Sequence, residues 1–189
     1  MKYQKILENE EYKKYVERIC YLEKDRIYCK HDLKHSLDVA RICTIIMYEQ
    51  GQEVNRDIVY ATALLHDIGR FKENTQNHEA LSVDIAKDIL SVCGYTATEI
   101  ATIVEIISFH RGNYSIKQID ELVNHGKLDL KESFKIADQL SRNCFCCKGS
   151  SSCKWKEENR STNIMMPFWC IPCIFAFEFG HQNLVYLFC

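Results

Sequence analysis

The adjacent residues His66 and Asp67 follow the apolar run 61–65, and Gly69 comes two residues later. An imidazole nitrogen and a carboxylate oxygen are ligands that divalent zinc, iron, manganese and nickel accept together. Neighbouring helical positions point about 100° apart, so both side chains reach one ion only at a helix end. Gly69 is expected to let the chain turn away there. Taken alone, the pair also fits an ordinary capped helix end.

Other imidazoles and one carboxylate lie at comparable positions along the chain. His35 and His78 stand where predicted helices begin, and His110 stands where one ends. Asp138 lies inside the last predicted helix, beside Ile136 and other apolar residues, so it is expected to be partly buried. A buried carboxylate must be paired or bound to a metal. Single residues of this kind are usually structural, but their joint order is hard to explain as coincidence.

Composition and periodicity predict an all-α domain. The chain has two prolines, Pro167 and Pro172, and seven glycines among 189 residues, so long helices meet few breaks. Apolar residues recur at helical spacing, and residues such as Asp32 and Thr96 stand at cap positions. Thr96 and Glu99 have capping-box spacing, with Thr98 as the alternative cap. The predicted helices cover 3–24, 32–50, 55 or 57 to 66, 77–94, 96 or 98 to 110, 116–123 and 131–142.

This order of residues resembles the HD superfamily of metal-dependent phosphohydrolases. Its signature is a histidine near a helix start, an adjacent His-Asp pair and a distant aspartate; here His35, His66, Asp67 and Asp138 stand in that order. The resemblance covers about 27–142 and implies an HD-domain helical bundle with a metal at its centre. His31 and Asp32 form a second His-Asp pair, for which we favour a different interpretation, in which Asp32 caps the helix and His31 merely flanks it.

The resemblance leaves open whether one or two metal ions bind. In two-metal relatives, such as HD-GYP proteins and dinucleoside tetraphosphate hydrolases, further histidines follow the His-Asp pair. By that analogy His78 and His110 would bind a second ion, and Asp67 would bridge it to the first. Alternatively, His78 and His110 bind substrate phosphate or orient water. The ions expected are manganese, iron, cobalt, nickel or zinc. No Gly-Tyr-Pro signature follows the fourth helix, so hydrolysis of cyclic di-GMP is not favoured.

The expected reaction is hydrolysis of a phosphate ester by a metal-activated water. Asp67 would be central to it, and Arg70, Lys72 and Arg111 could offset charge on the phosphate. Glu73 could act as a general acid or base, although charged side chains of this kind are more often ordinary surface groups. The substrate would be a nucleotide or another small phosphate ester. The rival function is a non-catalytic HD-like module that binds a nucleotide or a protein.

Cysteines suggest a second metal site. The chain has eleven of them and no apolar segment of signal-peptide length at its start, which favours free thiols or metal ligands over disulfides. Cys144 and Cys147 have the two-residue gap of a thiolate pair, Cys153 follows, and Cys29 is a candidate fourth ligand. Zinc is the default ion, and an iron–sulfur cluster would use the same ligands. The alternative is reduced cysteines without metal.

We expect three regions: a helical domain over 1–142, a cysteine-rich loop over 143–163 and an apolar aromatic tail over 164–189. The tail contains Cys170 and Cys173, which rival Cys29 as thiolate ligands, and it could bind a protein partner. Its apolar run is too short to span a membrane, so no membrane association is expected. The formal charge of −2 argues against nucleic-acid binding. A cytoplasmic location is expected.

Overall fold

The computed structural model describes residues 1–72, 77–125, 127–142, 144, 147–149 and 151–153, and no strand occurs among them. This part of the chain is all-α, as predicted. The elements are α1 (Lys2–Glu8), α2 (Glu10–Leu22), α3 (Leu33–Glu49), α4 (Arg56–Leu65), the 3-10 turn η1 (Ile68–Phe71), α5 (His78–Val92), α6 (Ala97–Phe109), α7 (Ile116–His125) and α8 (Leu130–Leu140).

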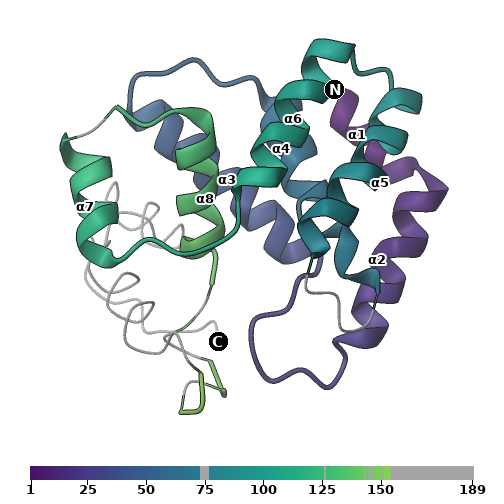
Figure 1. Cartoon of the computed structure of the whole chain (residues 1–189), viewed down its shortest axis with the longest axis horizontal. Coiled ribbons are helices and arrows are strands. Elements are labelled where there is room, and N and C mark those ends of the chain that lie inside the picture. Colours follow the sequence, from purple (N-terminus) through teal and green to yellow (C-terminus); the bar gives the residue numbers. More distant parts are fainter. Residues whose placement is uncertain (73–76, 126, 143, 145–146, 150, 154–189) are drawn as a thin grey trace, which may run out of the picture.

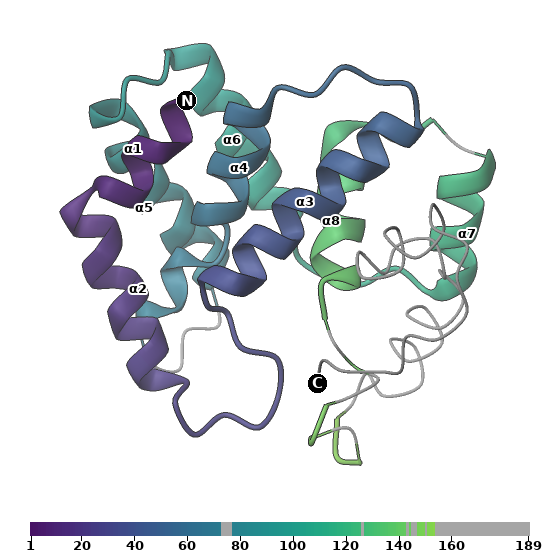
Figure 2. The same ribbon diagram turned by 180° about the vertical axis from the view of Figure 1, so that it is seen from behind.

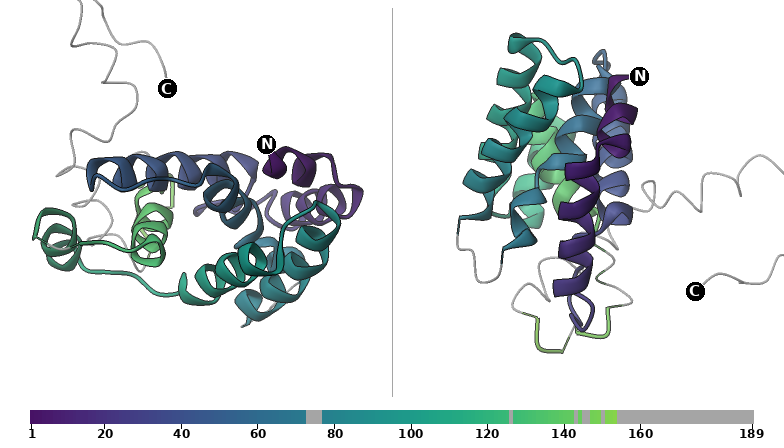
Figure 3. Two further views of the ribbon diagram at one scale, coloured as in Figure 1. Left: turned by 90° about the horizontal axis from the view of Figure 1, so that it is seen from above. Right: turned by 90° about the vertical axis from the view of Figure 1, so that its right-hand side faces the viewer.

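Helix α3 lies at the middle of the bundle, between α4 and α8 (Figures 1 and 2). Helix α6 packs on α4, α5 and α8, while α1 packs against α4 and α2 against η1. Seen from above, α7 lies at the edge of the bundle farthest from α1 and α2 (Figure 3). Apolar side chains from these helices form one continuous core, with Ile46, Leu65, Ile107 and Phe134 among the fully buried ones.

Helix starts follow the capping residues of the sequence. The Asp32 carboxylate accepts a hydrogen bond from the His35 backbone N–H (2.9 Å), which fixes the beginning of α3. Thr96, rather than Thr98, caps α6, and its capping box with Glu99 is formed. Helix α8 begins one residue earlier than predicted, and Asn77 occupies the cap position of α5 without a side-chain hydrogen bond.

The single helix predicted over 3–24 is wrong, because the chain bends at Asn9. The Asn9 backbone is extended, and its side-chain oxygen accepts from the Tyr12 backbone N–H at 3.0 Å. Asn9 therefore ends α1 and caps α2, since asparagine competes well with a continued helix when it can cap a new one. The bend lets Tyr3 stack on Tyr60 of α4, with ring centroids 4.7 Å apart.

Gly69 allows two segments to approach closely. A side chain at this position would place its Cβ 2.1 Å from the His78 backbone oxygen and 2.8 Å from the Ser82 nitrogen. The Gly69 N–H donates to the Ser82 hydroxyl at 2.9 Å. Gly69 lies in the 3-10 turn that follows α4, and a glycine is required there because η1 packs directly on the first turns of α5.

Within the described residues, no helix has the length and apolar character needed to cross a membrane. The predicted tail, 164–189, lies outside these residues, as does most of the cysteine-rich loop. A cytoplasmic location stays a prediction from the sequence.

Candidate metal centre

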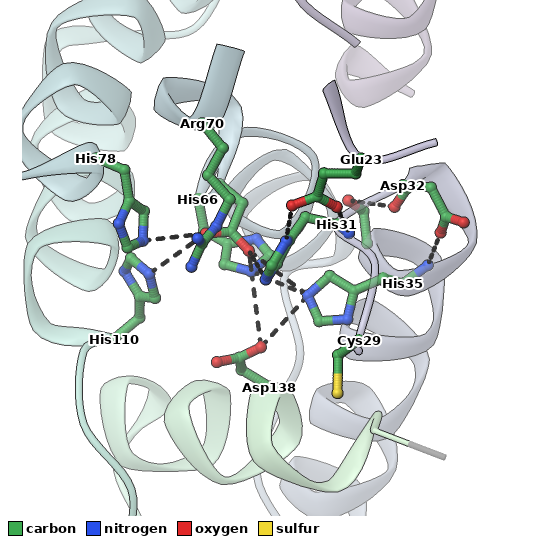
Figure 4. A network of polar contacts seen from close by, with 12 residues as sticks. Glu23, Cys29, His31, Asp32, His35, His66, Arg70, His78, His110 and Asp138 are labelled. Carbon is green, nitrogen blue, oxygen red and sulfur yellow. Dashed lines mark hydrogen bonds and ion pairs between the residues drawn. The ribbon is translucent and has the colours of Figure 1, made fainter. Parts of the chain in front are cut away.

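Three helices bring together the residues of the predicted signature (Figure 4). His35 comes from the first turn of α3, His66 and Asp67 follow α4, and Asp138 comes from α8. The Nε2 atom of His35 lies 3.3 Å from Asp138 Oδ1 and 3.4 Å from His66 Nε2. The Nε2 atom of His66 is in turn 3.2 Å from Asp67 Oδ2. Ligand atoms of His35, His66 and Asp138 are close enough to share one ion.

A second group faces the other oxygen of the same carboxylate. Asp67 Oδ1 lies 3.2 Å from His78 Nε2, at the start of α5, and 3.9 Å from His110 Nε2, at the end of α6. These three residues also have ligand atoms within reach of one ion. Asp67 thus presents Oδ2 to one group and Oδ1 to the other. We call these six residues, His35, His66, Asp67, His78, His110 and Asp138, the central cluster.

Hydrogen bonds to the outer ring nitrogens orient the imidazoles. The Nδ1 atoms of His66 and His110 donate to the backbone oxygens of Ala63 (2.8 Å) and Ile107. The Ser141 hydroxyl donates to the Asp138 backbone oxygen, so it is available to accept from His35 Nδ1 at 3.1 Å. In each case Nε2 is left to face Asp67. Metal-binding histidines are typically held in this way through the nitrogen that does not bind the ion.

Burial and close charges make the cluster strongly coupled. His66 is fully buried, which lowers its pKa, but Asp67 and Asp138 outweigh burial and raise the pKa of His66 to about 10. Burial raises the pKa of Asp67, yet the His66 charge and other cations hold it well below its usual range. Burial lowers the pKa of His110, and the His66 charge adds to this effect. At neutral pH an ion entering the site must therefore displace a proton from His66.

His31 also reaches the centre, contrary to the expectation that it merely flanks α3. Its Nδ1 donates to Glu23 Oε1 at 2.7 Å, and its backbone N–H donates to the other oxygen of the same carboxylate at 2.8 Å. Its Nε2 lies 3.8 Å from Asp67 Oδ2 (Figure 4). Asp32 does cap α3 as predicted, so capping and the placement of His31 in the site occur together. The sequence analysis did not identify Glu23, which accepts hydrogen bonds from His31. The second His-Asp pair, His31 and Asp32, was the only sequence signal that pointed to this region.

Five of the six residues of the central cluster, all except the fully buried His66, line a cavity of about 580 Å³. Guanidinium groups line this cavity; they belong to Arg26, Arg70, Arg111 and Arg142. Two of them were predicted site residues, and both are paired with acids. Arg70 Nε donates to Asp67 Oδ1 at 2.6 Å, and Arg111 donates to Glu79 Oε1 at 2.6 Å. Glu73 lies outside the described residues, and exposed Lys72 is not among the residues that line the cavity.

One buried nitrogen is placed as a metal ligand would be. Within the described residues, His78 Nε2 has no hydrogen-bond partner, although it is buried and directed at the Asp67 carboxylate. An unsatisfied buried nitrogen is unfavourable unless something else binds it. Together with the oriented imidazoles and the two carboxylates, this atom fits a divalent transition metal, whose preferred ligands are these nitrogens and oxygens.

The candidate cysteines lie beside this cavity. Cys29 and Cys144 are hydrogen-bonded through their thiols, and this bond lowers the pKa of Cys29 to about 6, against burial and with help from the Arg142 charge. The same bond and burial raise the pKa of Cys144. Cys147 Sγ lies 3.8 Å from the Ile27 backbone oxygen, and Cys153 lines the cavity with Cys29. Cys170 and Cys173 lie outside the described residues.

Comparisons with known proteins agree with this geometry. The model of the HD domain family matches residues 32–143. An uncharacterized protein of Clostridium beijerinckii (strain ATCC 51743 / NCIMB 8052) is 40% identical over 161 residues, which cover 84% of this chain and 95% of that protein. No solved structure gives a significant match. The chain therefore belongs to the HD domain family, whose members are usually metal-dependent phosphohydrolases.

Proposed function

We propose that this protein is a metal-dependent phosphohydrolase that acts on a nucleotide or another small phosphate ester. The observation that carries the proposal is that most of the central cluster lines the same cavity as four arginines. Arginine pairs with phosphate through several N–H groups, so such a lining suits an anionic ester.

The six residues of the central cluster would hold one or two divalent ions. When bound, such an ion lowers the pKa of a water towards neutrality and polarises a phosphoryl oxygen. Asp67 would keep the two halves of the cluster together through its two oxygens. Arg70 is held against Asp67, and Arg111 is held by Glu79 at the rim, so both guanidinium groups are oriented before a phosphate arrives.

The rival function, a non-catalytic module, is not favoured by the oriented imidazoles. A protein that only binds a nucleotide has no need of four Nε2 atoms facing one carboxylate. We therefore expect hydrolysis when nucleotides and simple phosphate esters are screened with manganese, iron, cobalt, nickel or zinc, each supplied to metal-free protein. The measurement is the release of phosphate or of a nucleoside product.

Asp38 offers a matched control for this screen. Its partly buried carboxylate lies on α3, where it pairs with Lys34 and Arg41, away from the cavity. Asp38→Asn should hydrolyse each substrate as the unchanged protein does. Binding of nucleotides without turnover, with every metal, would instead support the non-catalytic module.

We further infer that His31 contacts the bound substrate. Its ring faces the cavity, and two hydrogen bonds to Glu23 fix its direction. His31→Ala is expected to lower kcat/KM about a hundredfold with bound metal unchanged, since a positioned donor near the reacting group contributes on that order. Glu23→Gln should have a smaller effect, because an amide oxygen still accepts from Nδ1.

Lys30→Ala serves as the control for His31→Ala, since Lys30 is exposed and its ammonium group only contacts the Lys24 backbone oxygen in the described contacts. Metal content is measured in all three variants. Loss of an ion in His31→Ala would make His31 a ligand, and wild-type kinetics would remove it from the site; either result contradicts the assignment.

A further inference from the structure

Two segments far apart in the sequence meet beside the cavity. One is 27–29, between α2 and α3, and the other is 147–153, which follows α8. Both lie at the same end of the bundle, at the bottom of Figures 1 and 2. The Tyr28 hydroxyl is hydrogen-bonded to the Ser152 hydroxyl at 3.1 Å, which ties the two segments together.

Gly149 allows this contact to be close. A Cβ at this position would lie 2.8 Å from Tyr28 Cδ1 and 3.1 Å from the Ile27 backbone oxygen. A larger residue would force the Tyr28 ring or the Ile27 backbone to shift. The sequence therefore holds the backbone that carries Cys147 and Cys153 against the backbone that carries Cys29.

Four thiols border this junction. Those of Cys29 and Cys144 are in direct hydrogen-bond contact. The Cys147 thiol points back at the Ile27 backbone, two residues before Cys29, and Cys153 shares the cavity wall with Cys29. The spacing Cys144-x-x-Cys147 is typical of two thiolates that bind the same metal ion.

We propose that Cys29, Cys144, Cys147 and Cys153 form a second metal site, structural in role, that binds one zinc ion. Four thiolates complete the tetrahedral coordination of a structural zinc site, in which no position is left for a substrate. Among the described residues, no three of these thiols yet lie close enough together to share an ion, so metal binding would require Cys147 and Cys153 to move towards the hydrogen-bonded pair Cys29 and Cys144. The site would link the segment before His31, which carries Cys29, to the segment after Asp138, which carries Cys144. This link would stabilise one side of the cavity.

The site differs from the central cluster in its ligand atoms, and this difference makes it measurable. Cobalt bound by thiolates gives an intense sulfur-to-metal charge-transfer absorption in the near ultraviolet, whereas cobalt bound only by histidines and carboxylates does not. We expect the full-length protein, loaded with cobalt, to show this absorption. It should disappear in Cys29→Ser and in Cys144→Ser, with the loss of about one ion per chain.

Cys20 and the tail cysteines provide controls. Cys20 is exposed on α2, so Cys20→Ser should keep the full absorption. Cys170→Ser and Cys173→Ser should keep it as well. Asp67→Asn, which disturbs only the central cluster, should also keep it, so failure of the proposed phosphohydrolase activity and failure of the thiolate site are seen separately.

Three results would overturn the site. The first is the absence of sulfur-to-cobalt absorption in the unchanged protein. The second is an absorption that survives in both Cys29→Ser and Cys144→Ser but is lost in the Cys170 or Cys173 variant. The third is a protein mass lower by two hydrogens in the freshly purified protein, with Cys29 and Cys144 joined in one peptide, since a disulfide would leave no thiolates to bind an ion.

Discussion

Asp67→Asn is expected to lower hydrolysis by at least about a hundredfold while the helices stay intact. Asparagine keeps the shape of the side chain but removes the charge that faces both halves of the central cluster. Its amide oxygen is a poorer ligand, so one or both ions should bind less tightly. The measurements are phosphate release, metal content and far-ultraviolet circular dichroism. The helical signal should survive because the apolar faces of α3, α4, α6 and α8 form the core without this carboxylate.

The control Asp38→Asn, at a partly buried carboxylate away from the cavity, separates the loss of a metal ligand from the loss of any acidic group on these helices. Normal folding, normal metal content and normal hydrolysis in Asp67→Asn would show that the reaction does not depend on the central cluster. The metal-centred function proposed above would then be wrong.

His110→Ala is expected to reduce bound metal from about two ions to about one. His110 and His78 face Asp67 Oδ1, while the other half of the cluster faces Oδ2. Removing one imidazole from the second group should therefore release its ion and leave the first. His78→Ala should give the same stoichiometry, because a site with only Asp67 and one histidine is too poor in ligands to retain a transition metal at stoichiometric level.

His35→Ala is the contrasting variant, since it removes a ligand of the first group and should leave the second. Elemental analysis of each protein after dialysis gives the stoichiometry. If both His78→Ala and His110→Ala keep the metal content of the unchanged protein, these histidines bind substrate or orient water, which is the alternative left open by the sequence.

The helices could be predicted because their signals are local. Asp32, Thr96 and Glu99 stand at caps that the structure confirms, and apolar periodicity gave the rest within a few residues. The bend at Asn9 was missed because the helical pattern continues through it. The cap formed by Asn9 is local, but the packing of Tyr3 on Tyr60 is a contact between distant residues that accompanies the bend.

The residues of the central cluster were predicted from the resemblance to the HD superfamily, together with the position of most of them at predicted helix ends. The contribution of His31 could not be predicted in this way. It depends on the carboxylate of Glu23, which comes from the end of another helix and approaches only after the bundle has formed. The role of Gly69 likewise depends on α5, whose backbone lies against it.

The balance of ligands in the central cluster has an electrostatic consequence. Four of its six members are imidazoles, which bind metals in neutral form, and only Asp67 and Asp138 carry negative charge. Two divalent ions would bring about twice the charge that these carboxylates can neutralise. Local electroneutrality must then be restored by an anion from outside the protein. Although the chain as a whole carries a formal charge of −2, its cavity would attract an anion more strongly once metal has bound.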